Sequence, residues 1–234
     1  KTACEGIVML KNENDIFPIQ AKSKAGSDSV FETAVEDDLL SGVVLCGSGA
    51  IRLYDCGTGS AGITTDKDSS IYEGLIQNGV EVSIGIPAAG KRAGISTYIC
   101  VARIPGMEGN DRKDMKLSAE DAQILNQMLD LKRENPLVKL GLILNVSGPV
   151  DLALWEHELD GIFCMFLPGM EGGHAMADIL TGRVNPSGKL PLTFPKKYQD
   201  TPTYLNFPGD GYQVNYGEGI YVGYRYYDKK MVEP

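Results

Sequence analysis

Residues 97–144 read TYICVARIPGMEGNDRKDMKLSAEDAQILNQMLDLKRENPLVKLGLIL, and this stretch decides the fold class. It begins and ends with a short apolar run, at residues 97–101 and 140–144, and each run is typical of a buried strand. Between them, Ser118 is followed by Asp three residues later, a variant of the capping box, and a helical pattern continues to about Asn135. Strand, helix and strand in this order indicate an α/β unit.

The same alternation extends over the rest of the chain. Apolar, β-branched runs at residues 43–46, 80–86 and 161–166 are typical of buried strands, and residues 69–78 and 171–180 are typical of helices. Gly79 and Gly182 follow these two helices as end signals. The pattern predicts a single α/β-sandwich domain over residues 1–234, with a mainly parallel sheet sandwiched between helices.

Two segments fall outside the alternation. Residues 21–42 are polar and aperiodic, which predicts a surface insertion or loop. Residues 195–234 are rich in Tyr, Gly and Pro without a helical period. We expect this aromatic and glycine-rich segment to wrap over the domain and pack its rings rather than form a new core.

Composition excludes several classes of partner. The 234 residues carry a formal charge of −9 and no basic run, which argues against nucleic acid or an anionic membrane. No apolar run is long enough to predict a membrane span. The five cysteines form no CxxC pair, so neither a zinc nor a redox motif is expected. Free thiols favour a reducing compartment, so we expect a cytoplasmic location. Because the chain begins at Lys1, it is interpreted as a fragment of a larger enzyme, and secretion stays open.

The sequence gives little support for a metal site, a catalytic triad or a dinucleotide-binding site. His157 and His174 lie outside any metal-ligand spacing, and no GxSxG elbow holds a serine, so both are expected to be surface or structural groups. Residues 57–62 (GTGSAG) match the string GxGxxG, but the strand before and the helix after that a dinucleotide site requires are missing. We therefore predict no metal, no cofactor, and a structural or substrate-facing loop at 57–62.

One carboxylate stands out by its context, Glu108 in the segment RIPGMEGNDR at 103–112. The segment begins at the carboxyl end of a predicted strand, the edge where α/β sheets place ligand sites. Gly106 and Gly109 allow the loop to turn, and Asp111 and Arg112 are available to support it by an ion pair. Glycoside hydrolysis needs two carboxyl groups, one of them an acid at the leaving oxygen. From these features alone, Glu108 is either such a group or a solvated loop residue.

Several segments resemble, in order, motifs of the family 3 glycoside hydrolases. The Glu108 loop resembles SGEGxDR, residues 5–12 (EGIVMLKN) are similar to the opening helix EGIVLLKN, and residues 57–60 (GTGS) to GGGS. Further matches are residues 145–152 (NVSGPVDL), 168–182 (PGMEGGHAMADILTG), 185–195 (NPSGKLPLTFP) and 216–228 (YGEGIYVGYRYYD). The resemblance covers nearly the whole chain and is to the second, α/β-sandwich domain of β-glucosidase-type enzymes.

The resemblance implies a role and a partner. In that family the loop glutamate is the general acid/base, which assigns the role to Glu108, and hydrolysis proceeds by double displacement with retention. The nucleophile is an aspartate in an SDW or SDY motif on a TIM-barrel domain of the same polypeptide. No such motif occurs here, so the isolated chain is predicted inactive. The implied substrate is a terminal β-linked sugar, first a β-glucoside and second a β-xyloside, and a fibronectin III-like domain is an expected neighbour beyond Pro234.

Two departures from the family pattern concern the site. The sequence PGMEG differs from SGEG by one residue in register, which could displace Glu108 slightly. The segment between Val82 and Ser96 is also shorter than the family's, which is consistent with a deletion. In the isolated domain we expect Glu108 to be exposed and to titrate close to an ordinary glutamate, with a raised pKa in the assembled cleft.

Other residues receive supporting roles. Glu171 is the rival carboxylate, but it stands where a helix begins and is expected to hydrogen-bond there. Trp155 is expected to pack rather than to stack on sugar. The alternative functions are a non-catalytic carbohydrate-binding or assembly module of the same fold, and a flavodoxin-like binding domain. The residues expected to line the aglycone side are Arg52, Tyr54, Gly57 and Ser60.

Overall fold

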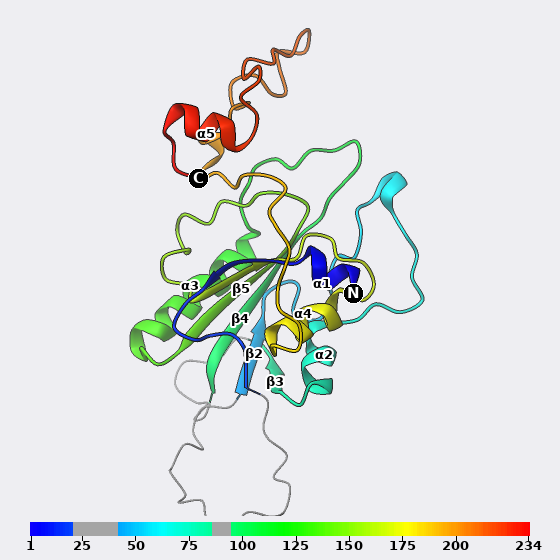
Figure 1. The fold of residues 1–234 in the computed structure, drawn as a ribbon, viewed down its shortest axis with the longest axis vertical. Coiled ribbons are helices and arrows are strands. Elements are labelled where there is room, and N and C mark those ends of the chain that lie inside the picture. Colours follow the sequence, from blue (N-terminus) through cyan, green and yellow to red (C-terminus); the bar gives the residue numbers. More distant parts are fainter. Residues whose placement is uncertain (21–41, 86–94) are drawn as a thin grey trace, which may run out of the picture.

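The computed structural model describes residues 1–20, 42–85 and 95–234, and within them one six-stranded sheet (Figure 1). The strand order is β1-β6-β5-β4-β2-β3, and every pair is parallel except β1 with β6. The predicted mainly parallel α/β sheet is therefore confirmed. The strands are β1 (Val8–Asn12), β2 (Gly42–Cys46), β3 (Glu81–Ile84), β4 (Ile95–Ile104), β5 (Lys139–Val146) and β6 (Gly161–Cys164).

Helices cover both faces of the sheet. The helices α1 (Thr2–Gly6), α2 (Ile71–Gln77) and α4 (Gly172–Leu180) lie on one face, and α3 (Ala119–Glu134) lies on the other (Figure 1). Successive residues of a strand point to opposite faces. Accordingly Val43 and Leu45 belong to the core under α2 and α4, whereas Val44 and Cys46 belong to the core under α3. Two layers of helix thus enclose a sheet that is buried on both sides.

The helix boundaries follow from hydrogen-bonded caps. Ser118 begins α3 by accepting the N–H of Asp121, as its position predicted. Ser70 and Glu73 form a complete capping box at the start of α2. Gly79 and Gly182, with φ of +81° and +71°, follow α2 and α4 in the left-handed conformation that lets the chain turn away.

The predicted opening helix over residues 5–12 is wrong. The helix α1 ends at Gly6, and residues Val8–Asn12 form the edge strand β1, antiparallel to β6. Val8 is buried and Met9 exposed, so the chain presents one face to the core as a strand does rather than one side of a helical turn. The predicted strand over 161–166 is also shortened, because Phe166 has a positive φ of 50° and turns the chain beyond Cys164.

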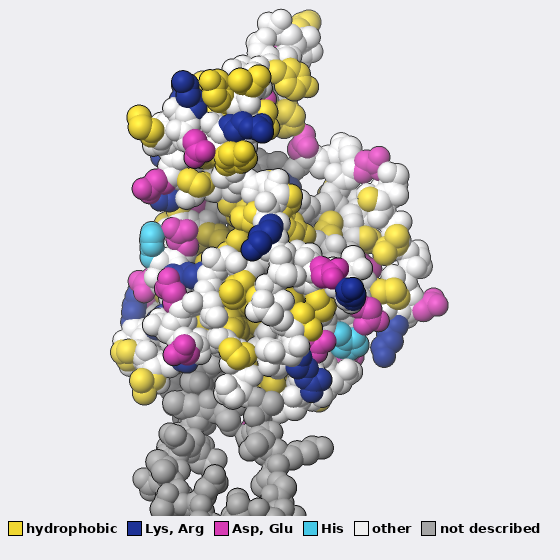
Figure 2. All heavy atoms as spheres, viewed as in Figure 1, with side chains coloured by type: hydrophobic (Ala, Val, Ile, Leu, Met, Phe, Trp, Pro, Cys, Tyr) yellow, Lys and Arg dark blue, Asp and Glu magenta, His cyan; other side chains and the backbone are white. Residues whose placement is uncertain are grey.

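The C-terminal segment rises above the carboxyl edge of the sheet and carries α5 (Tyr224–Lys230) (Figure 1). The predicted packing of its rings is met only in part. Tyr227 is buried, and Tyr198 meets Tyr204 edge to face at 5.2 Å. In contrast, Tyr212 and Tyr216 are exposed, and apolar side chains gather on the surface of this segment (Figure 2).

Two sequence predictions lie outside the described residues. The insertion predicted at 21–42 falls there except for Gly42, which begins β2. The shortened segment between Val82 and Ser96 falls there for the most part as well. Among the helices that are described, none has the length and apolar character needed to cross a membrane.

The connections define where a ligand edge lies. The helix α2 joins β2 to β3 and packs on one face, whereas α3 joins β4 to β5 and packs on the other. The strands β2 and β4 are neighbours in the sheet. From β2 the chain continues to β3 on one side, and from β4 it continues to β5 on the other side. In open α/β sheets such a switch point leaves a crevice outside the carboxyl ends of the two strands, and ligands bind there.

Candidate functional site

Glu108 lies at this switch point. It belongs to the loop that follows Ile104, the last residue of β4, and its side chain is exposed to solvent. Gly109 directly after it has a φ of +74°, which favours glycine and turns the loop back. The expectation that Glu108 is exposed on a loop at the carboxyl edge of the sheet is confirmed.

A second loop faces Glu108. Residues Gly59–Ala61 form a short 3-10 turn rather than an α-helix, so the string GxGxxG does not begin a helix on the sheet. The backbone N–H of Thr58 donates to the carbonyl oxygen of Gly106 at 3.0 Å, and the backbone N–H of Ser60 donates to the Glu108 carboxylate. Of the four residues expected to line the site, Gly57 and Ser60 therefore lie in the loop that faces Glu108.

These contacts change the electrostatics of Glu108. The backbone N–H and the hydroxyl of Ser60 lower the pKa of Glu108 below its ordinary value, because hydrogen bonding stabilises the carboxylate. This differs from the expected ordinary titration of an isolated loop glutamate. The difference arises from a contact across 48 residues of sequence that no local pattern encodes.

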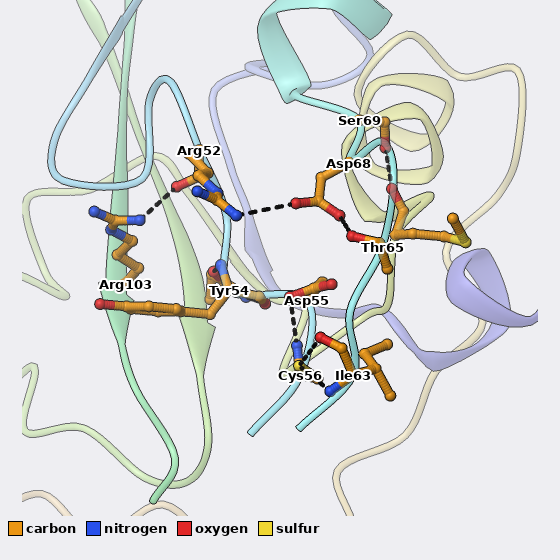
Figure 3. Close-up of polar contacts among 11 residues, drawn as sticks. Arg52, Tyr54, Asp55, Cys56, Ile63, Thr65, Asp68, Ser69 and Arg103 are labelled. Atoms are coloured by element: carbon orange, nitrogen blue, oxygen red, sulfur yellow. Dashed lines mark hydrogen bonds and ion pairs between the residues drawn. The ribbon is translucent and has the colours of Figure 1, made fainter. Parts of the chain in front are cut away.

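Arg52 and Tyr54 lie in a separate cluster at the same edge (Figure 3). The guanidinium of Arg103 stacks over the Tyr54 ring at 4.7 Å from its centroid and donates to the Arg52 carbonyl at 3.2 Å. The Arg52 side chain points the other way, to Asp68 at 3.3 Å. The sequence analysis assigned no role to Arg103. Its contacts with Arg52 and Tyr54 join residues about fifty positions apart, and no pattern in the sequence predicted them.

A hollow adjoins this cluster, outside the ends of β2 and β3. Its lining includes Ser48, Arg52, Arg103 and Glu120 but does not include Glu108. Glu108 is exposed to solvent and lies outside this hollow.

Asn145 ties the loops of this edge together. It is fully buried at the end of β5, where its side-chain oxygen accepts the N–H of Tyr54 at 2.6 Å. Its amide nitrogen donates to the carbonyls of Tyr54 at 2.8 Å and of Phe166 at 2.7 Å. One side chain thus fixes the loops after β2 and β6. A polar residue in an otherwise apolar strand was the sequence signal that could have identified it.

Asp121 has a similar role at the start of α3. It is buried and accepts both the backbone N–H of Ser48 at 2.7 Å and the Ser48 hydroxyl at 2.8 Å. The Ser118 hydroxyl donates to the same carboxylate at 2.8 Å. Asp121 therefore joins the turn after β2 to the helix that follows β4.

The support expected from Asp111 and Arg112 takes another form. Arg112 donates to the backbone carbonyl of Pro149 at 2.7 Å rather than pairing with Asp111, which is exposed. Burial lowers the pKa of Arg112, while the charge of Asp114 acts in the opposite direction. The predicted ion pair is thus replaced by a bond that links the Glu108 loop to the turn after β5.

The rival carboxylate, Glu171, makes a local contact with His174. It precedes α4 without capping it, and its carboxylate lies 2.8 Å from Nδ1 of His174. The N–H groups of Gly173 and His174 instead donate to the hydroxyl of Ser69. The cap comes from a residue distant in sequence because Ser69 lies two residues before α2, which packs against α4. Trp155 packs as predicted, with its indole N–H on Asn126 at 2.9 Å.

The described residues hold no cluster of metal ligands. Within the three described ranges, no group of three or more His, Cys, Asp or Glu side chains could hold a metal ion. Exposed His157 lies 3.3 Å from Glu156. The charged side chains at the sheet edge include the carboxylate of Glu108 and the guanidinium groups of Arg52 and Arg103.

Fold and site together define a doubly wound α/β domain with an exposed carboxylate at its ligand edge. The model of the glycosyl hydrolase family 3 C-terminal domain matches residues 7–224. The chain belongs to this family.

Three relatives illustrate the similarity. Thermostable beta-glucosidase B of Acetivibrio thermocellus is 34% identical over 100% of this chain and 31% of that protein. Exo-alpha-(1->6)-L-arabinopyranosidase of Bifidobacterium breve is 29% identical over 97% of this chain and 31% of that protein. The structure of beta-glucosidase 3B from Thermotoga neapolitana superimposes with a TM-score of 0.81 at 29% identity, over 99% of this chain and 36% of that one. The chain spans about a third of the length of each of these relatives.

Proposed function

We propose that this domain supplies Glu108 as the general acid/base of a retaining glycoside hydrolase that cleaves terminal β-linked sugars. The observation that carries the proposal is the position of Glu108: exposed, at the switch point of the sheet, and held by a hydrogen bond from the facing loop. Membership of glycosyl hydrolase family 3 supports a glycosidase. The names of the similar β-glucosidases favour a β-glucoside, with a β-xyloside as the second choice.

The chemistry requires a second carboxylate about 5–5.5 Å away. A nucleophilic aspartate would come from a TIM-barrel domain in the same polypeptide, which is consistent with relatives about three times as long as this chain. In the first step the aspartate bonds to the anomeric carbon while Glu108 donates its proton to the departing oxygen. In the second step water attacks the anomeric carbon and displaces the aspartate, while Glu108 accepts a proton from that water.

The open surface around Glu108 fits a divided site. Because the Glu108 side chain is exposed and does not line the hollow outside β2 and β3, the walls that exclude water from the reaction would come from the second domain. We therefore propose that the isolated chain is inactive and that docking of the two domains is part of catalysis. Arg52 and Tyr54 are proposed to lie on the aglycone side of the docked site.

The test uses the full-length protein and p-nitrophenyl β-glucoside. Glu108→Ala should lose turnover, and added azide should restore it, because a small anion attacks the glycosyl-enzyme without needing a general base. Glu171→Ala is the matched carboxylate control and should keep the wild-type rate. Undiminished turnover by Glu108→Ala would contradict the proposal and favour a non-catalytic carbohydrate-binding or assembly module.

We also propose a cytoplasmic location, on the basis of the cysteines. All five are free thiols, and burial raises the pKa of Cys164 to about 11, which keeps that thiol protonated and unreactive. Free thiols persist most readily in a reducing compartment. Fractionation of the source cells tests this, and recovery of the protein from the medium would refute it.

A further inference from the structure

The loop that carries Glu108 is hydrogen-bonded to the loop at residues 57–61 at two places, the base and the tip of the loops. At the base of the loops, the backbone N–H and the hydroxyl of Thr58 both point to the carbonyl of Gly106, at 3.0 and 3.4 Å. At the tip, the backbone N–H of Ser60 donates to the carboxylate of Glu108. The two levels together fix both the backbone of the Glu108 loop and the direction of its side chain.

Between these levels, Gly59 leaves no space for a side chain. Its φ is +75°, and a Cβ built on it would lie 2.6 Å from the Cβ of Glu108 and overlap the carboxylate. Gly169, in the loop after β6, has nearly the same φ of +79°, but a Cβ there would meet nothing within 4 Å. The two glycines therefore have nearly the same φ and differ in whether Glu108 occupies the adjacent space.

The turn also selects a protonation state. A backbone N–H can only donate, so it favours the carboxylate over the carboxylic acid. The lowered pKa of Glu108 likewise favours the ionised carboxylate. The ionised form is the one that accepts a proton from water, whereas protonation of a leaving oxygen needs the acid form.

From this geometry we infer that the turn Gly59–Ser60 is the positioning element of Glu108, holding the ionised carboxylate in one place by a backbone N–H and by the absence of a side chain at position 59. The inference rests on the proposed acid/base role and adds to it. Glu108 is presented in its base form, and it must take up a proton against the Ser60 N–H before it can act as an acid. The surroundings that the second domain supplies must offset this preference.

The test compares Gly59→Ala with Gly169→Ala in the full-length enzyme, on two substrates. A phenyl β-glucoside needs its leaving oxygen protonated, whereas a dinitrophenyl β-glucoside leaves almost without help. Gly59→Ala should lose about 100-fold in kcat/KM on the phenyl substrate, the effect of a misplacement of about 1 Å. It should lose far less on the dinitrophenyl substrate. Gly169→Ala should match wild type on both, because its side chain meets open space.

The pH profile is a second readout. Without the Ser60 donor, Glu108 keeps its proton to higher pH, so the alkaline limb of kcat/KM should move to higher pH in Gly59→Ala and stay in place in Gly169→Ala. Equal losses on both substrates in Gly59→Ala, or kinetics no different from those of Gly169→Ala, would overturn the inference.

A third variant separates the inference from the proposed function. If Glu108→Ala is rescued by azide but Gly59→Ala behaves like Gly169→Ala, Glu108 is the acid/base and the turn does not position it. If azide does not rescue Glu108→Ala, the proposed function itself fails, and the positioning role falls with it.

Discussion

Replacing Asn145 by alanine should destabilise the functional edge of the sheet more than any single surface change. The side chain is fully buried and makes three hydrogen bonds, to the N–H and C=O of Tyr54 and to the C=O of Phe166. The distances of 2.6, 2.8 and 2.7 Å lie at or just below the short end of the usual range for N–H···O bonds, so all three are close contacts. Alanine removes all three at once and leaves three backbone groups without these partners.

The magnitude follows from the cost of an unsatisfied buried group, about 1–3 kcal/mol. Three groups that share one partner are not independent, and water entering the space recovers part of the loss, so we expect a total of about 3–5 kcal/mol. For a domain of this size that unfolds as one unit, each kcal/mol lowers Tm by roughly 2–4 °C, which gives a decrease of roughly 6–20 °C in the unfolding transition of this domain.

The assay is thermal unfolding of the full-length protein at a fixed scan rate. Asn185→Ala is the control, because Asn185 is exposed and its amide reaches only the neighbouring carbonyl of Pro186, at 3.4 Å. The control should unfold within roughly 1–2 °C of wild type, as surface substitutions do. If Asn145→Ala unfolds at the temperature of the control, Asn145 does not hold these loops and the reasoning is refuted.

Three further predictions concern packing, capping and pH. Gly161→Ala should cost about 1–3 kcal/mol, since its Cβ would lie 2.9 Å from a methyl of Ile16, and Gly6→Ala, which faces open space, should cost less in the same unfolding assay. Ser118→Ala should cost about 1 kcal/mol by removing the cap of α3, measured by urea unfolding. Burial alone would raise the pKa of Asp160, but hydrogen bonds from Lys132, Leu140 N–H and Asn14 outweigh it and lower that pKa. Its stabilisation is therefore present above the unfolded value of about 3.9 and is lost as pH falls through the folded pKa; Asp160→Asn should flatten this acid decrease in Tm.

The layers of the fold could be predicted because each strand carries its own local signal. Residues 97–101 and 140–144 are continuously apolar, since both of their faces are covered, and the Ser118 cap marks the helix between them. The helix expected over residues 5–12 came from the resemblance to a family motif, and the apolar run at Ile7 and Val8 suits a helix or a strand equally well in isolation. Pairing with β6, which lies more than 150 residues away, decides in favour of the strand.

The site could be predicted in its location but not in its contacts. Glu108 was identified because a loop between glycines followed a strand, and its role came from resemblance. The Ser60 contact, the stacking of Arg103 on Tyr54 and the three bonds of Asn145 each join residues 21 to 91 positions apart. Such contacts depend on which strand ends are neighbours in the sheet. The periodicity of the sequence does not reveal the order of the strands.

The measurement that tests the central claim most directly is the identity of the product that full-length Glu108→Ala forms from a dinitrophenyl β-glucoside in azide. If Glu108 is the acid/base of a retaining enzyme, proton NMR should detect β-glucosyl azide, formed by two successive inversions at the anomeric carbon. α-Glucosyl azide, or hydrolysis at the wild-type rate without any azide adduct, would contradict the account.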